Sequence, residues 1–410
     1  MTAPNIQNVI IAGGSLAGLM HALPFLSLPD PPKVRILERS PTNLLHNQGA
    51  GVVAGADTQG FFERYVRPGR PIAVTSRLRH YLAKDGSVIK GSVDEREQRM
   101  TSWDLLYHLL RWRVDGWKSA YVSSEHGEGE HGLGKASYEH GSTIIDVRDL
   151  GKEGVEVCWE TKDGGEHTAT TDLLIAADGA SSTIRRLLLP DVHRTYAGYV
   201  AWRGTVPETQ LSASAAEAFV EKFTFFHTQG CQILAYLIPG ENGALEPGKR
   251  LANWVWYCNY EEGSEALDEL MTDSGGKRHA VTLPVGGIKP GVWSGQKSLA
   301  HAILPPQFAE LVQKTERPFV QAITDNVSPR NSFMGGKVLL VGDALAGFRP
   351  HTAASTSQAA FDAAMLGRWL EGGIGKEDYD GQCMAFAREV QAQGVRLGER
   401  SQFGRHPLAG

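Results

Sequence analysis

The chain has 410 residues, of which 41% are hydrophobic and 21% charged, and its formal net charge is −5. These values predict a globular protein of two closely packed domains, and a slightly acidic chain without a long Lys/Arg run argues against nucleic acid as a partner. The four cysteines lie far apart without a C-x-x-C pair, which argues against a disulfide framework and a zinc site and favours a reducing, cytoplasmic location. No uninterrupted apolar run reaches bilayer-spanning length, so we expect no membrane segment.

The N-terminal stretch predicts the opening of a parallel α/β sheet. Residues 8–12 (NVIIA) form a short apolar strand, glycines follow, LAGLMHALPFL has a helical pattern, and VRILER forms a second strand that reaches Glu38. The order strand, turn, helix, strand is typical of such sheets. We expect Pro24 to kink or shorten the helix, because proline lacks the amide N–H that a helix interior uses.

The middle of the chain predicts a helix followed by strands. Thr101 and Ser102 precede apolar residues at helical spacing and predict an N-capped helix over 101–112. The stretch 123–142 is rich in His and Glu, but its spacing fits no zinc motif, so an exposed loop is favoured over a metal site. Residues 142–178 predict strands, two of them joined by a hairpin turn at DGG.

The residues from about 193 to 300 predict a second sheet. The long aromatic runs YAGYVAWRGTVPE, FTFFHTQGCQILAYLIPG and LANWVWYCNY are typical of an inserted antiparallel sheet. PPQFAELVQKTERPFVQAI predicts a helix that leads to a short strand, KVLLVGDA. The tail from residue 352 onward predicts helices with Gly-rich breaks at 372–375.

The stretch IIAGGSLAGL, residues 10–19, has the pattern of a dinucleotide-binding turn with one glycine replaced. Gly13 and Gly18 stand at the first and third glycines of G-x-G-x-x-G, and Ser15 stands at the second. Serine is small, its hydroxyl can donate to a phosphate oxygen, and a helix N-terminus offers free N–H groups to an anion. Glycine-rich turns also occur for packing reasons alone, which is the alternative interpretation.

Glu38 favours dinucleotide binding. It lies about 20 residues after Gly18, at the end of the next strand, where a carboxylate can accept from ribose hydroxyls. The alternative is a solvated charge partnered by Arg39.

Two later motifs narrow the cofactor. LLIAADGASSTIR (173–185) and KVLLVGDALAGFRPHTAASTSQAAFDAAMLGRWL (337–370) each place a Gly/Asp turn after an apolar strand. In this order and spacing, the chain resembles over nearly its whole length the flavoprotein aromatic hydroxylases, the single-component FAD monooxygenases typified by para-hydroxybenzoate hydroxylase. The GGS form of the first turn, YAGYVAWRG, NWVWY and RPHTAA further resemble the 2,6-dihydroxypyridine 3-hydroxylase branch of that family.

The resemblance implies an α/β fold in which a Rossmann-like FAD-binding domain holds an inserted antiparallel-sheet substrate domain and ends in C-terminal helices. The expected FAD-binding parts are 1–72, 101–192 and 306–410, the last including the C-terminal helices, and the expected substrate-domain parts are 73–100 and 193–305.

The resemblance also implies FAD as the cofactor and NADH or NADPH as the electron donor. By it, Asp343 holds the ribityl chain and the loop from Pro350 to Ser357 runs beside the isoalloxazine. Ala353, Ser355 and Ser357 depart from the family's usual Gly, Gly and Asn. The expected cofactor-binding residues are Gly13, Gly14, Ser15, Leu16, Ala17, Gly18, Glu38, Arg39, Asp178, Gly179, Gly342, Asp343, Pro350, Thr352, Ala353, Ala354 and Ser355.

The implied reaction is hydroxylation of a small, electron-rich aromatic ring, of phenol or hydroxypyridine type, through a flavin C4a-hydroperoxide formed with O2. Alternation along NWVWY places Tyr257 on one face of a strand and its tryptophans on the other, so one face can line a cavity. His351 is a candidate to orient or deprotonate a phenol near neutral pH, or else to cap the following helix. The expected catalytic residues are Arg203, Tyr236, Tyr257 and His351, with ordinary packing as the alternative for each.

Two alternatives to aromatic hydroxylation stay open at this point. The same flavin chemistry could give oxidative decarboxylation, epoxidation or Baeyer–Villiger oxidation, or the chain could be a flavin-binding protein without turnover. The substrate, the choice between NADH and NADPH, and the oligomeric state, monomer or homodimer, do not follow from the residues.

Overall fold

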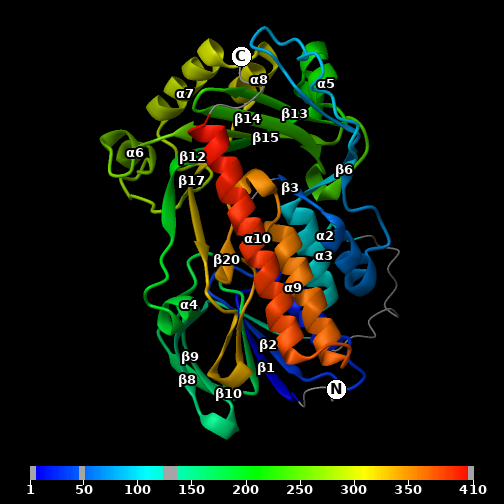
Figure 1. Cartoon of the computed structure of the whole chain (residues 1–410), viewed down its shortest axis with the longest axis vertical. Helices are drawn as coiled ribbons and strands as arrows, with labels where there is room; N and C mark the ends of the chain where they lie inside the picture. Colours follow the sequence, from blue (N-terminus) through cyan, green and yellow to red (C-terminus); the bar gives the residue numbers. More distant parts are fainter. Residues whose placement is uncertain (1–5, 46–50, 123–135, 405–410) are drawn as a thin grey trace.

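A computed structural model of the chain describes residues 6–45, 51–122 and 136–404, and it stacks two layers along the long axis of the molecule (Figure 1). The first layer contains a six-stranded sheet in which only the first strand is antiparallel to its neighbour. Its order is β18 (Ser332–Phe333), β19 (Val338–Leu340), β11 (Leu173–Ala176), β1 (Asn8–Ala12), β2 (Lys33–Glu38) and β7 (Ser137–His140).

Both faces of this sheet are covered. One face packs against the helices α1 (Leu16–Leu26), α3 (Trp103–Asp115) and α9 (Ser355–Leu370). The other face packs against a three-stranded sheet of β10 (Glu166–Thr171), β9 (Val155–Thr161) and β8 (Ser142–Asp149). The apolar runs on β1, β2 and β11 are therefore buried on both sides, as expected of parallel strands.

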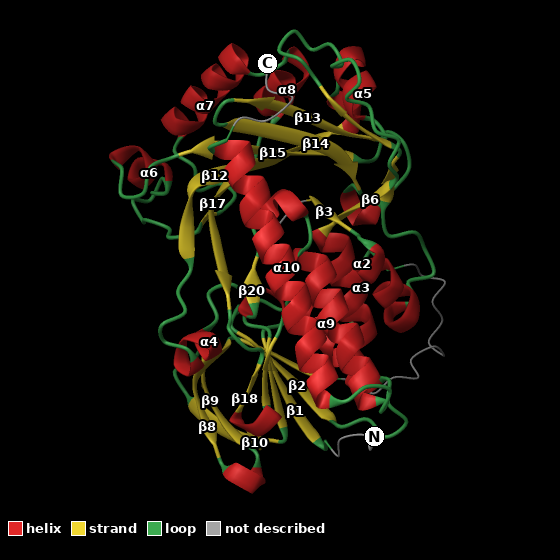
Figure 2. Ribbon diagram, viewed as in Figure 1, coloured by secondary structure: helices red, strands yellow, loops and turns green. Residues whose placement is uncertain are grey.

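The second layer is an eight-stranded, mostly antiparallel sheet, drawn at the top of Figure 2. Its order is β16 (Thr282–Leu283), β17 (Phe319–Val327), β12 (Thr195–Pro207), β15 (Leu251–Asn259), β14 (Cys231–Ile238), β13 (Lys222–Thr228) and β5 (Leu78–Tyr81), with β20 (Ala346–Gly347) paired to β17. Its outer face packs against α5 (Ala213–Phe219), α6 (Glu265–Leu270), α7 (Pro290–Ile303) and α8 (Pro306–Lys314). Its inner face carries a separate aromatic cluster that includes Tyr199, Tyr236 and Tyr257.

Further elements connect the two layers. A small sheet of β3 (Gly51–Val53), β6 (Gln98–Ser102) and β4 (Val74–Ser76) contacts β14, and α2 (Ala56–Phe61) contacts α9. The short helix α4 (Thr183–Leu188) contacts β8. The long helix α10 (Lys376–Gln402) contacts α9 as well as β14, β15 and β17, and Figure 1 shows it running past both layers.

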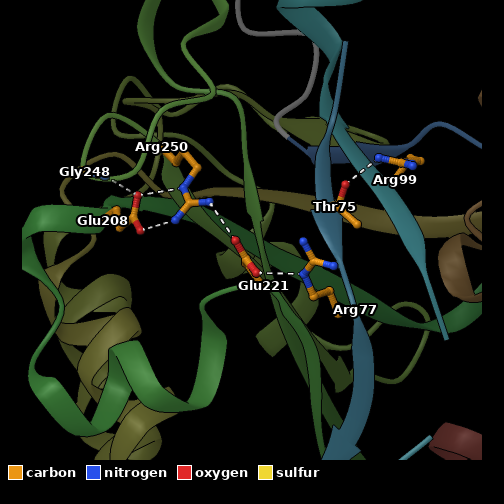
Figure 3. A network of polar contacts seen from close by, with 7 residues as sticks. All are labelled: Thr75, Arg77, Arg99, Glu208, Glu221, Gly248 and Arg250. Atoms are coloured by element: carbon orange, nitrogen blue, oxygen red, sulfur yellow. Dashed lines mark hydrogen bonds and ion pairs between the residues drawn. The ribbon is translucent and has the colours of Figure 1, made fainter. Parts of the chain in front are cut away.

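An ion-pair network lies where β12 ends and where β13 and β15 begin (Figure 3). The buried Arg250 donates to both carboxylate oxygens of Glu208, at 2.6 and 2.9 Å. Glu221 lies 3.9 Å from Arg250 and also accepts from Arg77 at 3.1 Å, in the link between β4 and β5. The network therefore joins the residue that follows β4 of the small sheet to the start of β13.

Most expected elements are confirmed. The strand, turn, helix and strand of the N-terminal stretch are β1, α1 and β2, and the hairpin at DGG joins β9 to β10. The hydroxyl of Ser102 accepts from the amide of Leu105 and caps α3. Within the described residues, no group of His, Cys, Asp and Glu could hold a metal ion, and no helix is both long and apolar enough to cross a bilayer. Of the His- and Glu-rich stretch, 123–135 lies outside the described residues, and Ser137–His140 forms β7 instead of the expected loop.

Three further expectations about the fold are wrong. Pro24 does not shorten α1, which continues to Leu26 because its last turn is buried against the core, whereas the kink expected as the alternative stays a prediction. The segment after α8 is not helical, since Pro318 prevents a continuing helix and the following residues form β17, paired with β12. Because α8 and β17 both pack in the second layer, the boundary expected at residue 305 divides that layer, which extends to Val327.

Candidate active site

A cavity of about 740 Å³ lies between the two layers and is lined by residues of both. On the first layer, its walls are the turns at the carboxyl ends of four neighbouring strands, β19, β11, β1 and β2. Parallel α/β sheets bind ligands at this edge. On the second layer, its walls are the inner faces of β5, β12, β13, β14, β15 and β17.

The turn after β1 has the form that a phosphate-binding turn needs. Gly13 has a φ of +98°, and a Cβ atom there would lie 2.4 Å from the carbonyl oxygen of Ala177. A Cβ on Gly18 would lie 1.9 Å from the carbonyl oxygen of Gly13, so this glycine lets α1 pack against the turn. Ser15, Leu16 and Ala17 line the cavity, and in this structure the Ser15 hydroxyl makes no capping hydrogen bond.

Two of the expected residues in this turn do not line the cavity. Gly14 lacks the positive φ that Gly13 has, and the Tyr138 hydroxyl fills the space where its side chain would be. Gly18 has the packing role just described. Both residues shape the turn, and their contact with the cofactor stays a prediction.

Glu38 is held by the backbone at the edge of the cavity. Its carboxylate accepts from the amides of Gly14, at 2.7 Å, and Ser40, at 2.8 Å, and the residue is buried. The alternative of a solvated carboxylate partnered by Arg39 is wrong. Arg39 itself lines the cavity, so both residues stay candidates for cofactor contacts.

The turn after β19 presents Asp343 to the cavity. The amide of Gly342 donates to the carboxylate of the buried Asp362 at 3.1 Å, and Gln358 donates to the Gly342 carbonyl at 3.1 Å. These two bonds from α9 fix the turn. Burial raises the pKa of Asp343, while the charges of Arg194 and Arg185 oppose that shift.

The central motif has a more structural role than expected. Asp178 lines the cavity with Gly179, but its carboxylate accepts from the Ser182 hydroxyl and from the amides of Thr183 and Ile184. Because these bonds cap α4, the side chain is already engaged. Arg185 donates to the carbonyls of Ala344 and Ala180 and so ties this motif to the turn after β19.

The loop between β20 and α9 closes one side of the cavity through Pro350, Thr352, Ala353, Ala354 and Ser355. Ala353 adopts a left-handed φ of +53°, an unusual value for a residue with a Cβ atom, and α9 begins at Ser355.

Arg349, just before this loop, is not an exposed charge. The guanidinium is buried and donates to Asp325 and, at 2.8 Å, to Glu399 on α10. It joins the loop to β17 and α10.

The second layer supplies an aromatic wall with a cation in it. Tyr236 and Tyr257 line the cavity, whereas Trp254 and Trp256 pack on the outer face, as the alternation predicts. Burial raises the pKa of Tyr236 to about 12, and the nearby charge of Arg203 opposes that shift. The Nε atom of Arg203 is buried and has no acceptor among the residues that the structure describes.

His351 lies beside this wall and is partly buried. Its Nε2 atom is 3.0 Å from the Tyr199 hydroxyl, and its ring centroid is 4.3 Å from that of Tyr257. Burial lowers its pKa to about 3, with the Arg349 charge contributing. The expectation of a base that titrates near neutral pH is therefore wrong, because burial disfavours the protonated ring.

The sequence motifs did not indicate some of the residues that line the cavity. Arg79 lies over the rings of Phe223, at 5.3 Å, and Phe225, at 5.0 Å. Arg400 and Ser401 come from the end of α10, close to the C-terminus. Alternation along β5 could have indicated Arg79, but no local pattern marks the two α10 residues as part of a site.

The residues present fit FAD. The cavity combines a turn without side-chain obstruction at Gly13, a helix N-terminus at Ser15, a carboxylate at Glu38 and a second carboxylate at Asp343. These groups suit a molecule with phosphates and many hydroxyls. The charged and aromatic side chains of the opposite wall, on the second layer, suit a small polar ring.

Comparisons with known proteins agree with this arrangement. Residues 196–325 match a family model described as FAD binding domain-like. The chain is 31% identical over 368 residues to 2,6-dihydroxypyridine 3-monooxygenase of Paenarthrobacter nicotinovorans, covering 89% of this chain and 83% of that protein. The structure of 2,6-dihydroxypyridine-3-hydroxylase from Arthrobacter nicotinovorans superposes with a TM-score of 0.80 at 27% identity, covering 98% of this chain and 94% of that one. Klebsiella pneumoniae HpxO, complexed with FAD and uric acid, shares the fold at a TM-score of 0.67 and 16% identity, covering 97% of this chain and 89% of that one.

The relationship excludes a flavin-binding protein without turnover, because it extends over most of both chains and the relatives are monooxygenases. The chain therefore belongs to the FAD-dependent aromatic hydroxylases, enzymes that use FAD and O2 to hydroxylate an aromatic ring.

Proposed function

We propose that this enzyme hydroxylates a small aromatic ring that already carries hydroxyl groups, of the hydroxypyridine or phenol type, with NADH or NADPH as electron donor. Bound FAD takes electrons from the nicotinamide and transfers one oxygen atom of O2 to the ring, so the difficult chemistry belongs to the cofactor. The protein binds both partners, orients them and excludes water.

The first layer of the fold would bind the cofactor. The N-terminus of α1 at Ser15 would receive the pyrophosphate, because its free amides and dipole favour an anion. Glu38 and Asp343 would accept from the hydroxyls of the cofactor, and the loop from Pro350 to Ser355 would hold the flavin ring. Asp178 and Gly179 would approach the cofactor from the turn after β11, while the Asp178 carboxylate keeps that turn in shape.

The substrate side rests on one observation, the buried Nε atom of Arg203 in the wall of the cavity, which has no acceptor in the described part of the chain. A buried N–H group without an acceptor is costly, so a ligand oxygen placed there would be bound favourably. An ionised ring hydroxyl satisfies this requirement and makes the ring electron-rich. The similarity to a protein named for its action on 2,6-dihydroxypyridine supports the same class of substrate.

The aromatic wall and His351 would orient the ring. Tyr236 and Tyr257 stay protonated at neutral pH, since burial raises the pKa of both phenols, and they can donate to ring oxygens. His351 is neutral and held by Tyr199, so it can form a directed hydrogen bond but is a weak base. Ionisation of the substrate would then depend on the positive charge of Arg203.

A substrate screen tests the proposal. Purified enzyme is mixed with NADH or NADPH and a panel of dihydroxypyridines, phenols and benzoates, and NAD(P)H oxidation is followed while products are identified by mass spectrometry. We expect at least one hydroxylated ring to accelerate oxidation and to gain one oxygen atom with its carbon skeleton intact. A product that has lost a carboxyl group, become an epoxide or gained a ring oxygen would replace the proposal with the corresponding reaction.

The cellular location and the oligomeric state of the enzyme are also open to test. A cytoplasmic location is supported by four unpaired thiols, which a reducing compartment preserves. Light scattering on the purified holoenzyme would distinguish the two oligomeric states left open, monomer and homodimer.

A further inference from the structure

A second cavity, of about 670 Å³, lies against the outer face of the eight-stranded sheet, away from the aromatic wall. It is bounded by the ends of β13, β14 and β15, by the segment after β5 and by the end of α7. Two cysteines, Cys231 on β14 and Cys258 on β15, line this cavity. Neither takes part in the proposed reaction.

These two cysteines face each other across neighbouring strands. Cys231 and Cys258 are paired residues in the antiparallel register of β14 and β15, and both contribute to the apolar cluster of the outer face. Directly opposed residues in such a pair have Cα atoms about 4.5–5.5 Å apart, which lies within the range that a disulfide requires. Both are free thiols in this structure.

The surroundings of the two sulfur atoms differ. Burial raises the pKa of Cys231 to about 11, but the Trp256 indole N–H, 3.0 Å from its sulfur, and the charge of Lys84 oppose that shift. Burial raises the pKa of Cys258 well above its ordinary value, the adjacent Cys231 adds to the shift, and the Gln296 amide, 3.5 Å from the sulfur, opposes it. Cys258 is the less buried residue of the two, but the donor at the Cys231 sulfur is closer, 3.0 Å against 3.5 Å. Because the thiolate is the nucleophile and this donor stabilises it, we assign Cys231 as the attacking partner, although both thiols react more slowly than an exposed cysteine.

We propose that Cys231 and Cys258 form a peroxide-reactive dithiol site, in which the second cavity admits a small hydroperoxide and the pair closes to a disulfide. The Cys231 sulfur attacks one peroxide oxygen, the O–O bond breaks, and the other oxygen leaves with a proton as water, or as an alcohol for an organic peroxide. The Cys258 sulfur then attacks the resulting sulfenic acid, an S–S bond forms, and water leaves. Two thiols are oxidised and one peroxide is reduced.

The site lies close to the active-site wall. Gln232 and Tyr257 are also paired across β14 and β15, one residue along from the cysteines, and both line the active-site cavity on the opposite face of the sheet. A new covalent link between Cys231 and Cys258 would therefore constrain the two strands that carry these side chains.

The test treats the holoenzyme with hydrogen peroxide, removes the excess with catalase, alkylates the remaining thiols after denaturation and maps the peptides by mass spectrometry. We expect a peptide cross-linked between Cys231 and Cys258, a fall from four free thiols to two, and reversal by dithiothreitol. Absence of that peptide, or prior oxidation of Cys158 or Cys383, would overturn the proposal.

Variants assign the two roles. The double variant Cys158→Ser/Cys383→Ser is the matched control and should still form the cross-link. In Cys258→Ser, a dimedone adduct should accumulate on Cys231, whereas Cys231→Ser should leave Cys258 unmodified. The reverse pattern would contradict the assignment of Cys231 as the attacking thiol. If either single variant fails to fold, the peptide map of the wild-type protein still decides whether the site exists.

Discussion

Replacement of Asp343 by Ala should weaken FAD binding strongly. Asp343 presents its carboxylate to the cavity, and its turn is fixed by bonds from Gln358 and Asp362, so the backbone should keep its shape in the variant. One hydrogen bond to a charged group contributes about 1.5–3 kcal/mol. At about 1.4 kcal/mol per factor of ten, the dissociation constant should rise roughly 10- to 150-fold.

The assay titrates FAD into apoprotein and follows the change in flavin fluorescence. Asp172→Ala is the matched control, because Asp172 accepts from the amides of Gln7 and Asn8 and lies outside the cavity. It should bind FAD as the wild type does, even if its melting temperature falls. Unchanged FAD affinity in Asp343→Ala, with a normal melting curve, would refute the assignment of Asp343 to the cofactor.

Three further predictions concern the loop, the buried acid and the substrate. Ala353→Gly should stabilise the protein by about 0.5–1 kcal/mol, because it removes an alanine with a left-handed φ, whereas Ala354→Gly, at a φ of −105°, should destabilise it. Urea unfolding midpoints that shift in the same direction for both variants would contradict this prediction. Burial raises the pKa of Asp362 from 3.8 to about 7, so the folded state holds a proton that the unfolded state releases. The contribution of Asp362 to stability should therefore be fully present below about pH 4 and fall by at most about 4 kcal/mol as the pH rises to 7. Asp362→Asn should lack this decline in denaturation curves measured across that pH range, and an unaltered pH dependence would show that another group is responsible. Arg203→Ala should raise the substrate KM about 10-fold or more while FAD content stays normal. Arg203→Lys should raise KM less, since it keeps the positive charge but not the planar, two-pronged geometry of the guanidinium. Equal KM values in the wild type and both variants would show that Arg203 does not bind the substrate.

The cofactor half of the site could be predicted from the chain because its residues follow strands in short motifs. Gly13, Ser15, Glu38 and Asp343 all lie where a parallel strand ends, and the alignment of parallel strands brings such ends together. The roles of Gly14 and Asp178 could not be predicted. Whether they touch the cofactor depends on Tyr138 and on the capping of α4, which are contacts made in the folded protein.

The substrate half was predictable only in part. Strand alternation correctly separated Tyr257 from Trp254 and Trp256, because its period is set by the backbone. The state of His351 was not predictable, since its low pKa comes from burial produced by distant segments. Arg400 and Ser401 were missed for a similar reason: α10 reaches the cavity through tertiary packing, and no local pattern encodes that path.

The most direct test of the account is a turnover experiment under heavy-isotope dioxygen. Holoenzyme is supplied with NAD(P)H and with the aromatic compound that best stimulates NAD(P)H oxidation, beginning with 2,6-dihydroxypyridine. The mass of the product is then measured by mass spectrometry. We expect one heavy oxygen atom on the ring for each NAD(P)H consumed, because one atom of O2 is transferred and the other leaves as water. A hydroxylated product whose new oxygen comes from water, or no labelled product from any ring of the panel, would contradict it.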